Sequence, residues 1–184
     1  DYVNKLYNMV MRNTSFDINF YCMTENSTGL NPKVNIIDLP QGLNGWWYKP
    51  WMFSSDTQLK GTTLYIDLDV VIAGNIDKLF TYKPDSWCTI RDFTRSMRPD
   101  WKKYNSSVVR FNENQLDWLW KEFRRDSRNI IKKFFGDQDF LYAYTHQKEP
   151  AELYPDEWIQ SWKWEIRSSR ELSSGAKGIR TLTR

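Results

Sequence analysis

The sequence predicts an α/β fold in which helices flank a mixed sheet. Two observations carry this prediction: short apolar runs rich in β-branched residues alternate with stretches of helical periodicity, and the alternation continues along most of the chain. The chain has 184 residues, of which 40% are hydrophobic and 16% aromatic, which suits one domain with a substantial core. We find no internal repeat, linker or low-complexity segment, and we therefore expect a single domain over residues 1–184.

The N-terminal part is expected to contain a helix, two strands and a short aromatic helix. Tyr2, Leu6 and Val10 recur at helical spacing, with Asp1 in the position of an N-cap. The predicted elements are a helix over 2–13, strands over the apolar runs 18–23 and 34–39, and a short helix over the aromatic run 46–53, which Pro50 breaks and which we expect to pack on the sheet.

The stretch 64–72 is the most informative part of the chain. It is apolar apart from Asp67 and Asp69, and it predicts a buried central strand. Side chains two apart on an extended chain point the same way, so both carboxylates would meet at the end of this strand. Two charges beside an apolar strand are costly unless they are neutralised, and Mg²⁺ and Mn²⁺ prefer oxygen ligands. A divalent cation site and a solvated acidic pair are therefore the two alternatives.

The C-terminal part is expected to alternate strands and helices. Its predicted elements are a helical turn over 76–80, strands over 86–90 and 106–111 around a polar loop at 91–104, helices over 113–125 and 127–135, a helix over 137–144 capped by Asp137, and a frayed end over 173–184. The helix over 113–125 has Leu116, Leu119, Trp120 and Phe123 on one face and basic residues on a solvated face.

Composition and motifs exclude several classes of protein. A net charge of +3 is too small to favour a nucleic-acid partner. No apolar run approaches the roughly 20 residues that span a bilayer, and no charged and apolar leader begins the chain, so we expect no transmembrane segment and a cytoplasmic location. Cys22 and Cys88 lie in apolar stretches and are expected to be reduced thiols. Neither a P-loop nor a dinucleotide-binding pattern occurs.

The run from Asp67 to Val71 also resembles the D-x-D-x-[TV] nucleophile motif of haloacid-dehalogenase-type phosphatases. In that family the motif follows the first strand. Here a helix and two strands are expected before it, and no later acidic pair follows a strand to hold a metal ion. These two differences count against a phosphatase, which we keep as an alternative hypothesis because of the motif.

Three blocks together resemble the glycosyltransferases of the GT-A fold, in the glycogenin-like and lipopolysaccharide-galactosyltransferase-like group of family 8. They are LYIDLDVVIAGNIDKLF at 64–80, YNSSVV at 104–109 and GDQD at 136–139, within a matched span of about 2–164. The resemblance implies a Rossmann-like GT-A sheet. It also implies metal-dependent, retaining transfer of a sugar from a nucleotide-diphospho-sugar, a UDP-sugar in particular, to a glycan, lipid or protein acceptor, with Mn²⁺ or Mg²⁺ as cofactor.

The resemblance also assigns roles to residues of this chain. Asp67 and Asp69 would hold the metal ion, Lys49 would face the donor phosphates, Asn105 and Ser106 would contact sugar hydroxyls, and Asp137 and Gln138 would bind the donor sugar, with Gln138 nearest the reacting carbon. Each role has a structural alternative: a surface lysine at 49, a plain strand edge at 105–106, and simple N-capping by Asp137.

The resemblance further implies two segments that we do not find in residues 1–184: a first strand before the opening helix, and a late H-x-G-x-x-K-P segment with a third metal ligand. A nucleotide-sugar- or glycan-binding remnant without catalysis is therefore a second alternative. Trp158 and the run 161–164 are candidates either for an acceptor cleft or for core packing, because aromatic faces stack on sugar rings. The single histidine, His146, is not expected to be a ligand.

Overall fold

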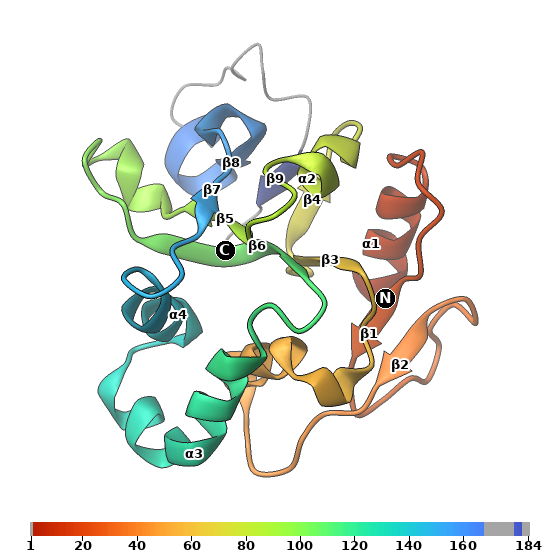
Figure 1. Cartoon of the computed structure of the whole chain (residues 1–184). Coiled ribbons are helices and arrows are strands. Elements are labelled where there is room, and N and C mark those ends of the chain that lie inside the picture. Colours follow the sequence, from red (N-terminus) through yellow and green to blue (C-terminus); the bar gives the residue numbers. More distant parts are fainter. Residues whose placement is uncertain (1, 168–178, 182–184) are drawn as a thin grey trace.

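The computed structural model describes residues 2–167 and 179–181 (Figure 1). Its helices are α1 (Tyr2–Met11), α2 (Asp77–Thr81), α3 (Asp117–Lys133) and α4 (Asp137–Thr145), with the 3₁₀ segments η1 (Gly45–Phe53), η2 (Ser55–Thr57), η3 (Phe93–Ser96) and η4 (Asp156–Trp158) and the π-helical segment η5 (Trp162–Ile166). Its strands are β1 (Tyr21–Met23), β2 (Asn35–Ile37), β3 (Thr62–Ile66), β4 (Val70–Ile72), β5 (Cys88–Arg91), β6 (Tyr104–Asn112), β7 (Glu152–Leu153), β8 (Ile159–Ser161) and β9 (Ile179–Thr181).

The strands form a mixed sheet flanked by helices, which confirms the predicted α/β class. The four-stranded sheet has the order β3-β6-β5-β7, in which β6 is antiparallel to β3 and β5 and β7 is parallel to β5. Within the described residues, β4, β9 and β8 form a second sheet, and β1 and β2 form a parallel pair. The predicted α/β class is therefore right, but the prediction of one sheet is not, because the described strands form three separately hydrogen-bonded sheets.

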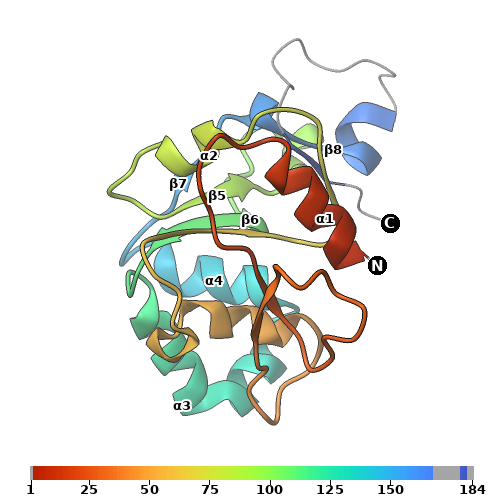
Figure 2. The same ribbon diagram turned by 90° about the vertical axis from the view of Figure 1, so that its right-hand side faces the viewer.

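Strand β6 lies at the centre of the molecule because both of its faces are buried. Val109 and Phe111 pack in one core with η1, α3 and α4, whereas Val108 packs in a second core with α1, β4 and α2. Figure 2 shows α3 and α4 on one side of β6 and α1 and α2 on the other. The alternation of side chains along an extended strand thus assigns neighbouring residues of β6 to opposite cores.

The stretch 64–72 is not the single central strand that its apolar character predicts. β3 ends at Ile66, Leu68 and Asp69 form a turn, and β4 continues in a different sheet. The Val70 amide donates to the Asp67 carbonyl oxygen at 3.1 Å, which closes this turn. β3 is also an edge strand of its sheet. An apolar run has the same composition whether it forms one strand or two, so the sequence pattern does not reveal the break.

Two predicted helices and one predicted loop differ in the structure. The helices expected at 113–125 and 127–135 are one helix, α3, bent at Asp126, where φ is −138° and ψ is 33°. Its basic side chains are exposed, as predicted. The N-cap of α4 is Gly136 and not Asp137, which is the first helical residue. The loop expected at 91–104 contains η3, and β6 begins at its last residue.

Two further expectations concern the ends of the chain and the cysteines. Asp1 and most of the end predicted to be frayed lie outside the described residues, but 179–181 form β9 between β4 and β8. Cys88 is buried and Cys22 is partly buried, and both are free thiols as predicted. In the part of the chain that the structure describes, no helix is both long enough and apolar enough to cross a membrane.

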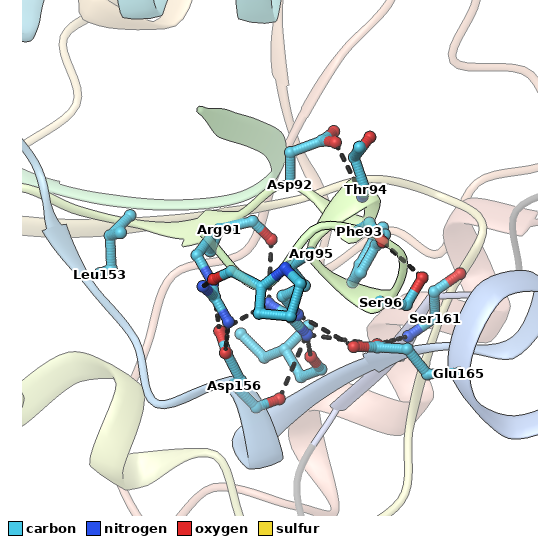
Figure 3. A network of polar contacts seen from close by, with 12 residues as sticks. Arg91, Asp92, Phe93, Thr94, Arg95, Ser96, Leu153, Asp156, Ser161 and Glu165 are labelled. Carbon is cyan, nitrogen blue, oxygen red and sulfur yellow. Dashed lines mark hydrogen bonds and ion pairs between the residues drawn. The ribbon is translucent and has the colours of Figure 1, made fainter. Parts of the chain in front are cut away.

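An ionic network around the buried Arg95 joins the segment after β5 to the segment 156–165 (Figure 3). Arg95 is 5% exposed, and its guanidinium forms ion pairs with Asp156 and Glu165, each at 2.9 Å. It also donates to the carbonyl oxygen of Ile159 at 2.8 Å, and Arg91 forms a further ion pair with Asp156. Because a buried charge is costly without partners, this network holds η3 in place. The N-cap of η3 is Asp92, which reaches the site described next.

Candidate functional site

A cavity of about 630 Å³ opens where β3 ends, β6 begins and α4 starts. The predicted site residues that line it are Lys49, Asp67, Asp69, Ser106, Asp137 and Gln138. Asn105 does not line it but contacts Gln138. The fold therefore brings together residues that lie up to 89 positions apart in the sequence.

The turn after β3 directs Asp67 and Asp69 into the cavity. The Asp67 amide donates to the Ser107 carbonyl oxygen at 2.9 Å, which extends the pairing of β3 with β6 by one residue. The Asp67 carboxylate accepts a hydrogen bond from the Tyr65 hydroxyl at 2.6 Å and another from Lys49 Nζ at 3.0 Å. The two aspartates face the same cavity because of a turn, and not because they alternate along a strand.

Lys49 is held among acidic and hydroxyl groups. Its neighbours on η1, Trp47 and Met52, are buried in the core, which fixes the backbone of this short segment. The Lys49 side chain is 16% exposed, and Nζ lies 3.7 Å from Asp137 Oδ2. It also donates to Ser106 Oγ at 3.1 Å. The alternative of an ordinary surface lysine is therefore wrong.

A bulge in β6 directs Ser106 and Ser107 to the cavity. The register between β5 and β6 shifts between Thr89, which pairs with Val109, and Ile90, which pairs with Asn105. The Thr89 hydroxyl fills the space under the bulge and lies 2.9 Å from the carbonyl oxygen of Asn105. An extra stretch of strand without direct partners can re-aim side chains beside a site, which explains how 106–107 reach the cavity.

Asp137 is 8% exposed and contacts the other polar residues of the cavity. Its Oδ2 accepts a hydrogen bond from Ser106 Oγ at 2.6 Å. Burial raises the pKa of Asp137 above its usual range, although Lys49 and Ser106 act in the opposite direction. Burial also raises the pKa of Asp69, and the nearby Asp67 carboxylate adds to this effect. The cavity therefore gathers negative charge that its surroundings solvate poorly.

The side-chain amide of Gln138 takes part in a chain of hydrogen bonds, two of them long. The Ser107 amide donates to Asn105 Oδ1 at 3.0 Å, and Asn105 Nδ2 donates to Gln138 Oε1 at 3.4 Å. On the other side, Gln138 Nε2 donates to Asp92 Oδ2 at 3.5 Å. These contacts orient the amide between β6 and η3. Asp92 was not identified as a site residue from the sequence. The one feature of the sequence that pointed to it is its position directly after an apolar strand.

Aromatic residues at the rim of the cavity were also missed. Trp46 is 53% exposed and Phe135 is 90% exposed, and both line the cavity. The expectation that the aromatic run at 46–53 packs on the sheet holds for Phe53, whose ring contacts Phe111 of β6. Trp47 is buried but stacks on Phe123 of α3, and the expectation is wrong for the exposed Trp46. Tyr65 also lines the cavity, and burial raises its pKa well above the usual range, with a smaller contribution from Asp67.

The aromatic residues predicted for an acceptor cleft lie elsewhere. Trp158 packs against Tyr82 and Lys78, with the Lys78 ammonium 4.0 Å from the ring centre, so core packing describes it better. Trp162 and Trp164 are exposed but do not line the cavity. His146, the C-cap of α4, stacks on Tyr142 and does not line the cavity.

The carboxylates of Asp67 and Asp69 fit a hard divalent cation. Both line one cavity, and the pKa of Asp69 is raised partly by the charge of Asp67, so a cation between them would relieve an existing repulsion. No cluster of three or more His, Cys, Asp or Glu side chains suited to a metal ion occurs within 2–167 and 179–181. Such a site would take its remaining ligands from water or substrate, as Mg²⁺ sites commonly do.

A second cavity, of about 860 Å³, lies between α1 and the start of β4. It shares Leu68 and Asp69 with the first cavity, and Tyr2, Lys5 and Val70 are also part of its lining. The two cavities therefore meet at the turn that carries the D-x-D residues.

The structure is similar to those of solved glycosyltransferases. LgtC, a galactosyltransferase solved with donor and acceptor sugar analogs, has a TM-score of 0.65 at 13% identity over 100% of this chain and 83% of its own. The bifunctional glycosyltransferase WbbM has a TM-score of 0.67 at 10% identity over 100% of this chain and 43% of its own. GlyE of Streptococcus pneumoniae TIGR4 has a TM-score of 0.58 at 14% identity over 83% of this chain and 41% of its own.

These comparisons establish the fold. The chain has the GT-A glycosyltransferase fold, and it spans less than two thirds of the length of GlyE and WbbM. A scan against protein-family models found no match, and neither did a search of curated protein sequences.

Proposed function

We propose that this protein is a glycosyltransferase that moves a sugar from a nucleotide-diphospho-sugar, a UDP-sugar in particular, to an acceptor. The observation that carries the proposal is the meeting of Asp67, Asp69, Lys49, Asp137 and Gln138 at one cavity of a GT-A fold. Membership of the family 8 group and a retaining outcome belong to the same proposal, and they rest on the three sequence blocks.

The donor diphosphate would lie beside Asp67 and Asp69, which would hold Mn²⁺ or Mg²⁺. The cation would supply positive charge to the diphosphate as it leaves. Lys49 adds a second positive charge beside the same carboxylates. The nucleoside would extend into the second cavity, which begins at the same turn. This arrangement gives each part of the donor a place next to residues of suitable chemistry.

The sugar of the donor would lie against Ser106, Asp137 and Gln138. Ser106 Oγ donates its one hydrogen to Asp137, so the two side chains together present fixed acceptor oxygens to sugar hydroxyls. The Gln138 amide is oriented by Asn105 and Asp92. A fixed amide avoids the entropic cost of ordering a flexible side chain in each catalytic cycle.

The acceptor would approach across Trp46 and Phe135 at the rim of the cavity. Exposed aromatic rings are costly in water, and they stack well on the apolar faces of sugar rings. This assigns the acceptor contact to a surface other than Trp158 and 161–164. The acceptor itself, whether a glycan, a glycolipid or a glycosylated protein, would present a sugar ring to these side chains.

Thermal unfolding with a panel of nucleotides tests the proposal. UDP and UDP-sugars should raise the unfolding temperature when Mn²⁺ or Mg²⁺ is present and should have little effect in EDTA, because a ligand that binds only the folded state stabilises it. A nucleotide effect that persists unchanged in EDTA would contradict the metal site. Hydrolysis of a stabilising UDP-sugar would then separate an enzyme from a binding remnant.

The phosphatase alternative makes a different prediction for Asp67. Both carboxylate oxygens of Asp67 already accept hydrogen bonds, from Tyr65 and from Lys49, which suits a positioned ligand better than a free nucleophile. Fluoroberyllate mimics a phosphoryl group on a nucleophilic aspartate. Incubation with it should leave Asp67 unmodified, and an adduct on Asp67 would favour the phosphatase.

A further inference from the structure

Lys49 neutralises the residue that would hold the metal ion. Its Nζ donates to Asp67 Oδ2 at 3.0 Å and lies 3.7 Å from Asp137 Oδ2. It is further anchored by Ser106, with Oγ at 3.1 Å and the carbonyl oxygen at 3.4 Å. The side chain is only 16% exposed, so these contacts are poorly screened by solvent. The ammonium is therefore the resident counter-ion of the cavity.

The charges of the cavity are out of balance with this one counter-ion. The lining of the cavity contains four aspartates, Asp67, Asp69, Asp137 and Asp139, and one basic residue, Lys49. Asp139 has its own partner in Lys103 at 3.6 Å. The other three carboxylates share one ammonium, which leaves the ionised site with an excess of negative charge. A divalent cation would correct the excess. Among the residues that the structure describes, Lys49 and the Tyr65 hydroxyl occupy the two carboxylate oxygens of Asp67. The cation and the ammonium thus compete for the same carboxylate.

We propose that Lys49 is an exchangeable counter-ion, which leaves Asp67 when a divalent cation binds and then serves the donor diphosphate. The proposal rests on the proposed function and adds a regulatory consequence to it. Cation binding alone is weakened, because it must displace Lys49 from Asp67. When a diphosphate binds, the displaced Lys49 ammonium gains a new negatively charged partner, so displacement by the cation costs less. The cation and the nucleotide therefore each strengthen the binding of the other.

This exchange predicts effects of opposite sign in one variant. Lys49→Met keeps the length of the side chain and removes its charge. Mn²⁺ alone should then bind more tightly, because the carboxylates lose their competitor. UDP in the presence of saturating Mn²⁺ should bind more weakly, because the diphosphate loses a positive partner. A lysine that only supports the fold would weaken both, so the signs separate the two roles.

Mn²⁺ binding is measured from the electron paramagnetic resonance signal of free Mn²⁺, with and without UDP, and UDP binding by calorimetry. We expect Lys49→Met to bind Mn²⁺ alone about tenfold more tightly, and UDP with Mn²⁺ about tenfold more weakly, which are modest effects for charges this close. Lys49→Arg should preserve the enhancement of Mn²⁺ affinity by UDP. Lys60→Met, at a lysine that is 75% exposed and paired with Glu113, is the matched control and should behave as the wild type.

Folding of each variant is checked by circular dichroism and thermal unfolding, and Lys49→Gln, which keeps a donor for Ser106, replaces Lys49→Met if the latter is unfolded. Equal or weaker Mn²⁺ binding in the folded variant, together with wild-type coupling to UDP, overturns the exchange while the proposed function stands. Absence of any binding of Mn²⁺ and UDP to the wild-type protein overturns both.

Discussion

At the scale of residues, the proposed function gives the cavity two kinds of residue. Asp67 and Asp69 sit at the turn between β3 and β4, where they can hold a cation. Gln138 sits at the start of α4, where its amide is oriented by Asn105 and Asp92. The first pair would act on binding of the diphosphate, whereas the amide would act on the sugar during transfer.

This division predicts different behaviour for Asp69→Asn and Gln138→Ala. Removal of a metal ligand weakens binding of the cation and, with it, binding of the diphosphate. Asp69→Asn should therefore lose UDP affinity and turnover together, each by about tenfold or more. Gln138→Ala should keep metal-dependent UDP affinity within about twofold and lose turnover by roughly 10-fold to 100-fold, because an interaction made mainly in the transition state appears in kcat.

UDP affinity by calorimetry and hydrolysis of a UDP-sugar provide the two readouts. The division would be wrong if Gln138→Ala lost UDP affinity as severely as Asp69→Asn, or if it kept full turnover.

At the scale of elements, α2 is fastened to the end of α1 by one carboxylate. Asp77 accepts hydrogen bonds from the Thr14 hydroxyl at 2.6 Å, and from the Ser15 amide and hydroxyl at 3.0 and 2.7 Å. The Ile76 amide donates to the Asn13 carbonyl oxygen at 2.8 Å beside it. The connection holds the chain after α1 against the segment that follows β4, and β4 begins at the D-x-D turn.

The same contacts predict a pH-dependent contribution to stability. Hydrogen bonds from Ser15, Thr14 and Asn75 hold the pKa of Asp77 well below its usual range. A carboxyl group with a lowered pKa in the folded state stabilises the protein above its unfolded pKa of about 3.9, and that contribution is lost as the pH falls toward the folded value.

Asp77→Asn should therefore lower the unfolding temperature at pH 7, and the difference from the wild type should narrow as the pH falls below about 4. Thermal unfolding followed by circular dichroism between pH 7 and pH 3 measures the difference. Asp126→Asn is the control, because its exposed carboxylate has no ion pair among the described residues and only one hydrogen bond from Asn129. A constant difference across the pH range would mean that shape, and not ionisation, explains the effect.

At the scale of the whole molecule, the cavity lies between the two hydrophobic cores that pack on opposite faces of β6. The side formed by η1, α3 and α4 contributes Trp46, Lys49, Phe135 and Gln138 to its lining. The turn between β3 and β4 contributes Asp67 and Asp69. Phe135 follows α3 and is 90% exposed, so it contributes little to either core. Its exposure at the cavity rim is better explained by binding than by folding.

Phe135→Ala should accordingly leave the unfolding temperature nearly unchanged, because the ring is already in water, and should raise KM for the acceptor by roughly tenfold, which corresponds to loss of about 1.4 kcal/mol of stacking. Donor hydrolysis without acceptor should be unaffected. The measurements are thermal unfolding, acceptor KM and hydrolysis rate. Trp162→Ala is a matched control at a ring that is 45% exposed but outside the cavity. Equal effects of both changes on acceptor KM would remove the rim from the proposal.

The sequence by itself determined the class of fold and most of the polar site. Alternating apolar patterns gave α/β, because the periods of strands and helices are local properties of the chain. Asp67, Asp69, Asp137 and Gln138 were assigned because they lie in short blocks that resemble those of a known family, and the structure places all four at one cavity. Lys49 was assigned from the same resemblance, by its place before the D-x-D block, although its burial among carboxylates was not predictable.

Only the tertiary structure decided the features that depend on contacts between distant segments. The break between β3 and β4 arises where β6 stops pairing with one segment and β9 begins pairing with the next. Trp46 and Trp47 are adjacent and chemically identical, yet Trp46 lines the cavity whereas Trp47 stacks on Phe123 of α3. Asp92 joins the site through η3, which the Arg95 network holds in place. Composition is the same in either arrangement, so the pattern along the chain cannot choose between them.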